Sequence, residues 1–195
     1  NSLNDSPLET LDNIFMFFDG TVDFTGWDTS KVKNFTSTFH CAETITAAQA
    51  LSISYASAED LTGCFYGLYD LKNLDLTKLK LPKAKKISSM FGGRSDVTSL
   101  YYSNLELPDT LEEAEKLFIG LSGLTSFDLG KIKNMPLTSM KEWFNGCKAL
   151  TTIDISDVDM SETTTLQGIF KNCENLEMVY LPDSLCYPNK IESLK

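Results

Sequence analysis

The stretch FNGCKALTTIDI, residues 144–155, is the part of the sequence that best indicates the fold. Its last three residues, from Ile153 to Ile155, alternate apolar, polar, apolar, which is typical of a short β-strand with one buried face. The stretch FKNCENLEMVYL, residues 170–181, has the same arrangement of apolar residues after its own phenylalanine. The two stretches indicate a repeated structural unit, so the rest of the chain was searched for further copies.

The repeat extends over most of the chain. One phenylalanine per unit recurs at steps of 26, 26, 27, 26 and 26 residues: Phe39, Phe65, Phe91, Phe118, Phe144 and Phe170. Apolar residues follow each of them six, nine and eleven residues later, and in five units fourteen residues later. The 27-residue step requires one extra residue, which we place near residues 108–110. An incomplete unit precedes the first phenylalanine of the series, and we find no phenylalanine in register before Phe39.

This pattern predicts a solenoid, because one unit of about 26 residues is too small to bury its own apolar face and must stack on its neighbours. The alternating positions predict short parallel strands. The apolar spacing of three and four before each phenylalanine predicts one or two helical turns. We expect a single domain over residues 1–195, with an N-terminal cap and partial repeat over 1–38, six repeats over 39–181 and a tail over 182–195.

The repeated pattern Leu71-x-x-Leu74-x-Leu76 resembles a leucine-rich repeat. Residues 144–155, together with 170–176, resemble the BspA-like leucine-rich repeat proteins of bacterial and protist surfaces. The resemblance implies an α/β fold, a right-handed β-α superhelix with parallel strands on one face and helical turns on the other. It also implies an extracellular, cell-surface-associated module that binds proteins or host surfaces. One feature departs from ordinary leucine-rich repeats: no asparagine column follows the strands, so the turn backbone must find other partners.

The candidate ligand-binding residues form the outward-facing column ten residues after each phenylalanine. Gln49 occupies it in the first complete unit. The residues proposed for ligand binding are Asp23 from the partial unit, Asp75, Tyr101, Asp128, Asp154 and Tyr180. Strands about 4.8 Å apart would make neighbours of Asp128 and Asp154, whose like charges repel. We interpret the column as an acidic strip bordered by aromatic rings that faces a basic protein patch, a cation or a sugar. The alternative is a solvated polar face copied along with the repeat.

Other reactive residues give weaker indications. The cysteines Cys41, Cys64, Cys147, Cys173 and Cys186 are interpreted as small buried residues, with a Cys41–Cys64 or Cys173–Cys186 disulfide as the alternative. A lysine cluster over residues 78–86 is interpreted as a solvated loop or, alternatively, as a contact for anionic glycans. The single histidine, His40, is expected to be structural or exposed.

Composition limits the function further. The 195-residue chain has a formal net charge of −10, which repels nucleic acid phosphates, so no nucleic acid partner is expected. Its longest apolar run, residues 14–18, is too short to insert into a membrane. We expect a monomer with no catalytic residues, metal or cofactor, which acts as an adhesion module for a protein or glycan ligand. The alternatives are a structural spacer without a ligand and, more remotely, a glycan-active enzyme that uses a carboxylate pair.

Overall fold

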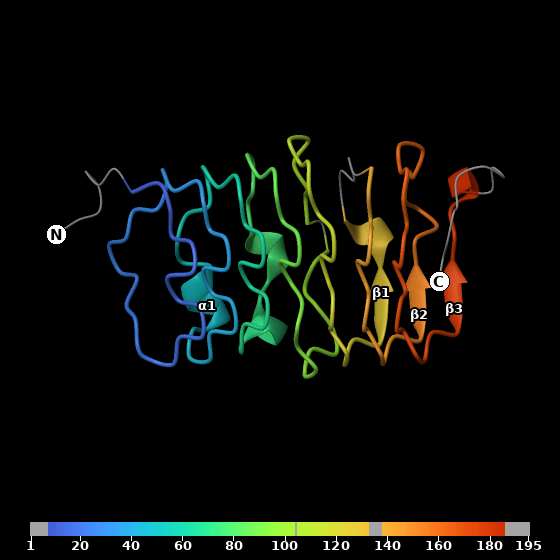
Figure 1. Ribbon diagram of the computed structural model, residues 1–195, viewed down its shortest axis with the longest axis horizontal. Helices are drawn as coiled ribbons and strands as arrows, with labels where there is room; N and C mark the ends of the chain where they lie inside the picture. Colours follow the sequence, from blue (N-terminus) through green and yellow to red (C-terminus); the bar gives the residue numbers. More distant parts are fainter. Residues whose placement is uncertain (1–7, 104, 133–137, 186–195) are drawn as a thin grey trace.

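The computed structural model describes residues 8–103, 105–132 and 138–185. Successive coils of the chain lie side by side in sequence order along the long axis of the molecule (Figure 1). Toward the C-terminal end, three coils contribute β1 (Ser126–Asp128), β2 (Thr152–Asp154) and β3 (Met178–Tyr180), which form a parallel sheet in that order. The parallel pairing of strands one repeat apart, predicted from the sequence, is confirmed.

The helices are all short. They are α1 (Ala47–Ala50) and the 3₁₀ turns η2 (Leu71–Asn73), η3 (Leu76–Lys78), η4 (Leu129–Lys131) and η5 (Asp183–Leu185). The position of α1 corrects the sequence prediction, because the repeat places a strand there. Thr46 and Gln49 form a reciprocal capping box around this turn, and alanine is the best helix former. As a result Ala48, expected to face inward, is exposed.

The repeated phenylalanines form a continuous column through the core. From Phe39 to Phe170 each ring stacks on the next, with centroids 5.6–6.3 Å apart and planes within 22°. The column begins one coil earlier than predicted, because Phe15 stacks on Phe39 at 5.8 Å and 6°. Phe15 escaped the sequence search because its step to Phe39 is only 24 residues. The stack is therefore confirmed, and the expectation that it starts at Phe39 was wrong.

The segment around each phenylalanine is a run of tight turns, so the prediction of helical turns was wrong. In the coil of Phe39, the N–H groups of Ser37, Phe39 and Cys41 donate to carbonyls of the next coil at 2.7–2.9 Å. The N–H groups between them, from Thr38 and His40, donate three residues back within the coil at 3.1 and 3.2 Å. Alternate amides thus hold neighbouring coils together. Consecutive turns give an apolar spacing similar to that of a helix, which explains the mistaken prediction.

Two positions in each of these runs have a left-handed backbone. They lie two residues before and two residues after the phenylalanine, and the second is glycine in four coils: Gly67, Gly93, Gly120 and Gly146. Type II turns require this conformation at their third residue, where glycine has no steric penalty. At Gly67 the space is also limiting, since an added Cβ would lie 2.6 Å from the Cys41 sulfur. Glycine at this position therefore does not cap a helix. Its lack of a side chain allows adjacent coils to pack closely.

A second parallel ladder, one residue wide, runs five residues before the phenylalanines. Its bridges join Thr10 to Asn34, Asn34 to Asp60, Asp60 to Lys86, Lys86 to Glu113, and Ser139 to Thr165. The offset is 26 residues at the Asp75–Tyr101 bridge and 27 at the Lys86–Glu113 bridge. The extra residue of the 27-residue step therefore lies between Tyr101 and Glu113, in agreement with the predicted position.

Candidate functional site

Five of the six predicted site residues lie in one row across the coils. Asp128, Asp154 and Tyr180 are direct register partners at the ends of β1, β2 and β3, and Asp75 bridges to Tyr101 in the earlier coils. The two groups adjoin, because the Tyr102 hydroxyl accepts the Asp128 N–H at 2.8 Å. We call Asp75, Tyr101, Asp128, Asp154 and Tyr180 the strand-face row.

Asp23, the sixth predicted residue, lies outside this row. The coil between Asp23 and Asp75 carries α1 in place of a strand. In that coil the Gln49 amide donates to the Val22 carbonyl at 2.9 Å, and its side-chain oxygen accepts the Thr46 N–H at 2.9 Å. The outward column is therefore interrupted at Gln49, whose side chain caps α1, and the placement of Asp23 in the same strip stays a prediction.

The aspartates of the row close the turns that follow them. One carboxylate oxygen accepts the N–H two residues on: Thr77 for Asp75 at 3.1 Å, Gly130 for Asp128 at 3.0 Å, and Ser156 for Asp154 at 2.9 Å. Asp23 does the same with Thr25 at 2.8 Å. Such bonds stabilise a turn by satisfying its exposed donor. The aspartates thus provide the acceptors that the turn backbone was expected to need.

Hydrogen bonding also favours the ionised form of the Asp75 and Asp154 carboxylates. The side chain and backbone of Ser156 lower the pKa of Asp154, and those of Thr77 lower the pKa of Asp75, since hydrogen bonds to the charged form favour it. Lys78 further pairs with Asp75 at 3.4 Å. Asp128 and Asp154 lie opposite each other in register. The row therefore carries two carboxylates side by side on β1 and β2.

Exposed aromatic rings border this acidic pair. Tyr101 is 63% exposed and Tyr180 is 49% exposed, and Met178 beside Tyr180 on β3 is 49% exposed. Between the coils of Tyr101 and β1, the buried Tyr102 ring stacks on Phe127 at 4.2 Å and supports the sheet from within. The row thus presents carboxylates with accessible rings on both sides, on a surface formed by the outward side of a sheet.

Two hollows of the described surface are lined by residues outside the row. One groove of about 420 Å³ runs between the loop from Leu79 to Pro82 and the loop from Glu106 to Thr110, where the extra residue enters the repeat. Another hollow, of about 500 Å³, lies at the C-terminal end of the stack. Neither Asp128 nor Asp154 lines either of these two hollows.

The lysine cluster is divided among separate ion pairs. Lys78 contacts Asp75, Lys85 contacts Glu59 at 2.7 Å, and Lys86 contacts Glu113 at 2.9 Å. These pairs link adjacent coils or adjacent turns of one coil. Three of the five lysines in the cluster are therefore paired with carboxylates, and the alternative of a glycan contact stays a prediction.

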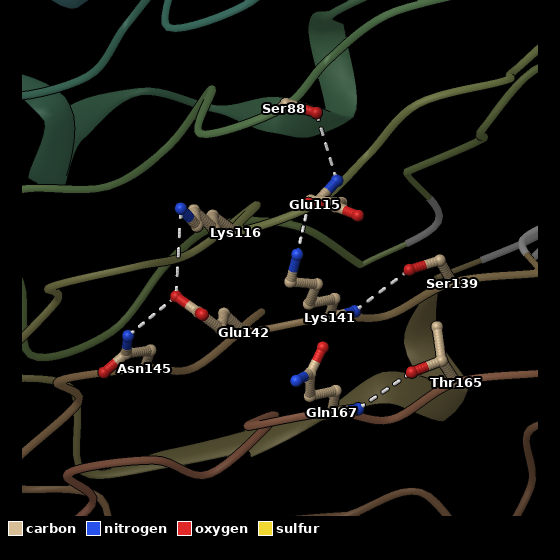
Figure 2. A network of polar contacts seen from close by, with 9 residues as sticks. All are labelled: Ser88, Glu115, Lys116, Ser139, Lys141, Glu142, Asn145, Thr165 and Gln167. Carbon is tan, nitrogen blue, oxygen red and sulfur yellow. Dashed lines mark hydrogen bonds and ion pairs between the residues drawn. The ribbon is translucent and has the colours of Figure 1, made fainter.

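The sequence analysis missed a polar network on the side of the coils that carries the second ladder (Figure 2). Lys141 pairs with Glu115 at 3.5 Å, Lys116 with Glu142 at 3.9 Å, and Asn145 donates to Glu142 at 3.0 Å. A signal was present in the sequence. Two and three residues before the phenylalanines, the charges are reversed between neighbouring coils, with Glu115 and Lys116 in one coil and Lys141 and Glu142 in the next. These exposed pairs align neighbouring coils and add little stability individually.

The single histidine packs on an aromatic ring, and the four described cysteines are free thiols. His40 stacks on the Tyr66 ring at 4.9 Å, and burial lowers its pKa. Cys41 and Cys64 are free thiols, so the structure does not contain the alternative Cys41–Cys64 disulfide. Cys64 and Cys147 are buried, as expected, Cys41 and Cys173 are only partly buried, and Cys186 lies outside the described residues. Within residues 8–103, 105–132 and 138–185, no group of three or more His, Cys, Asp or Glu side chains could hold a metal ion.

The chain is thus a repeat protein with a short parallel sheet, a stacked aromatic core and an acidic, aromatic-bordered outer row. The family model described as "Mycoplasma protein of unknown function, DUF285" matches residues 6–104 and 109–180. This match covers most of the chain, which therefore belongs to that family. The gap in the match falls where the extra residue enters the repeat. No curated protein and no solved structure matches the chain. In the described segments, no helix is long and apolar enough to cross a membrane.

Proposed function

We propose that this chain is a non-enzymatic recognition module, a leucine-rich repeat solenoid of the BspA-like type that acts at the cell surface. Its ligand is a protein or a glycan, bound through the strand-face row. The observation that carries the proposal is the placement of the two exposed tyrosines on either side of the Asp128–Asp154 pair. Exposed aromatic side chains are enriched at binding surfaces, because they bury a large area on association at low entropic cost.

The chemistry of the row favours a ligand that offers hydrogen-bond donors or positive charge beside an apolar face. A carboxylate accepts hydrogen bonds from hydroxyl groups, guanidinium groups and ammonium groups, and tyrosine rings stack on sugars and on cationic side chains. The neighbouring Asp128 and Asp154 repel each other, and a ligand that neutralises them would remove this repulsion. Sugars and basic protein patches both meet these requirements.

Binding by the tyrosines can be tested with a glycan array and a panel of basic proteins. We expect the double variant Tyr101→Ser/Tyr180→Ser to lose at least about tenfold in affinity, or ~1.4 kcal/mol, for whichever probe the wild-type chain binds. Tyr69→Ser is the matched control, because Tyr69 is 56% exposed but lies outside the row, near Arg94. Equal binding by the wild type and the double variant would contradict the proposal.

The charge of the row can be tested separately with Asp128→Asn/Asp154→Asn. Asparagine keeps an oxygen that can accept the N–H of Gly130 or Ser156, so the turns remain closed while both charges are removed. We expect weaker binding of a cationic probe with an unchanged unfolding transition. Unaltered affinity would show that the carboxylates act only within the turns.

A structural spacer is the second candidate function. The observation that favours it is the use of every aspartate in the row by its own turn, which gives each carboxylate a role without a ligand. A spacer would bind none of the probes in either screen, and its row variants would differ from wild type only in stability.

A further inference from the structure

The described stack ends at the C-terminal side in an apolar surface. A hollow of about 500 Å³ there is lined by Phe170, Leu176, Val179 and Leu181 together with three neighbouring residues. Leu181 is 40% exposed, although the residue at the same place in the repeat is almost fully buried in the preceding coils, as at Leu129 and Ile155. The side chains of this coil are therefore shaped to be covered by a further coil.

The backbone of the same coil carries a row of unused donors. In the coil before it, Met140, Glu142, Phe144 and Gly146 donate their N–H groups to the last described coil at 2.9–3.1 Å. The equivalent N–H groups of the last coil have no acceptor among the described residues: Leu166, Gly168, Phe170 and Asn172. An edge of this kind is a template for pairing with another chain.

The opposite end of the stack carries the complementary acceptors. In the second coil, the carbonyls of Asn34, Thr36, Thr38 and His40 accept the N–H groups of the first coil at 2.8–3.0 Å. The equivalent carbonyls of the first coil accept no backbone N–H within the described part of the chain: Thr10, Asp12, Ile14 and Met16. Ile14 is 50% exposed, while its equivalents in all later coils, such as Cys64 and Leu117, are completely buried.

We propose that copies of this chain associate head to tail, with the first coil of one copy stacked on the last coil of another. Four donors at one end match four acceptors at the other with the same spacing, and both ends are apolar. The contact would repeat the step that already joins successive coils within the chain (Figure 1). Such an interface joins two different surfaces and does not close on itself, so it produces linear assemblies and not only dimers. This association replaces the monomer expected from the sequence.

The association can be measured on the full chain by sedimentation velocity between about 1 µM and 1 mM, the range of weak to moderate affinities. We expect the mean mass to rise with concentration through dimers to longer assemblies. Two variants block one end each: Ile14→Glu at the first coil and Leu181→Glu at the last. Both residues are at least 40% exposed, so both variants should unfold with wild-type cooperativity.

Each variant alone should be monomeric, because every contact needs one intact surface of each kind. A mixture of the two variants should form a dimer that grows no further, since the Ile14→Glu chain still offers its last coil and the Leu181→Glu chain its first. Tyr69→Glu, an exposed control on the side of the stack, should assemble like wild type. A wild-type chain that stays monomeric overturns the proposal, and so does a mixture that stays monomeric. Dimers of Leu181→Glu alone would also overturn it, because they require two identical ends to meet. None of these measurements depends on ligand binding by the strand-face row.

Discussion

At the scale of single residues, the aspartates of the strand-face row both close turns and give the row its negative charge. Each carboxylate closes its own turn through one oxygen, and the row nevertheless stays outward-facing and charged. In the turns after the strands, the backbone N–H two residues after each aspartate needs an acceptor. No asparagine can supply it from the position of Leu79 and Val158, because that position is occupied by buried apolar residues. A row of aspartates can therefore persist without a ligand, and charge alone is a weak argument for binding.

The turn bonds make stability depend on pH. Asp154 has a pKa below its ordinary value of 3.8, because Ser156 donates hydrogen bonds to the ionised form. A carboxylate with a lowered pKa stabilises the fold above its ordinary pKa, and this contribution disappears as the pH falls through the folded-state pKa. We expect the thermal midpoint of the wild-type chain to drop as the pH falls below about 4. Asp154→Asn should show a smaller drop, because asparagine accepts the same bond without titrating. Identical pH profiles from calorimetry would contradict the assigned role.

At the scale of elements, the strand is a minor part of each coil and the turn run is the major part. Alternate amides of the run reach the next coil, while the others close turns within their own coil. Among the described residues, sheet pairing extends over three residues only in β1, β2 and β3. The rings between these two ladders therefore have to supply much of the cohesion between coils, through apolar burial and stacking.

A ring in the middle of the column should matter more than one at its end. Phe91 is 1% exposed and lies between Phe65 at 6.0 Å and Phe118 at 5.9 Å. We expect Phe91→Ala to lower the free energy of unfolding by about 3–5 kcal/mol, because it removes a buried ring and leaves a cavity. Phe170→Ala should cost less, since Phe170 is only partly buried and stacks on Phe144 alone among the described rings. Urea unfolding would measure both, and equal losses would show that the column does not act as a stack.

At the scale of the whole molecule, each coil contacts mainly the coils next to it, so stability should be approximately a sum over coils and their interfaces. The inserted residue between Tyr101 and Glu113 is accommodated in the loop that borders the groove, and both ladders continue beyond it. The repeat therefore tolerates local changes that leave the register of the two ladders intact.

Removal of one whole coil should leave a folded protein. Deletion of residues 66–91 joins Phe65 to Gly92 and keeps every later residue at its place in the repeat. We expect a cooperative thermal transition at a lower midpoint, because one set of coil interfaces is lost. Deletion of residues 66–78 removes half a coil and puts the remaining positions out of register, so it should abolish cooperative unfolding. Circular dichroism distinguishes these outcomes, and a loss of folding in both deletions would contradict the coil-by-coil arrangement.

Predictions from the sequence succeeded where a residue type recurs at a fixed distance. The column from Phe39 to Phe170, the parallel pairing, the extra residue near 108–110 and the neighbouring positions of Asp128 and Asp154 all follow from the repeat length. They failed where local chemistry overrides the repeat. The capping box of Thr46 and Gln49 produces α1 at a strand position, and the short 24-residue step hides Phe15.

The sequence by itself determined which residues are buried together, because an apolar side chain repeated every 26 residues can be covered only by its counterparts in neighbouring units. Only the tertiary structure decided how the backbone between them is bonded. The same apolar spacing fits a helix and a run of turns, and the choice depends on whether an amide finds its acceptor in its own coil or in the next. The structure likewise decided the role of the aspartates. The sequence does not show whether a carboxylate oxygen accepts a hydrogen bond from the following turn or faces solvent.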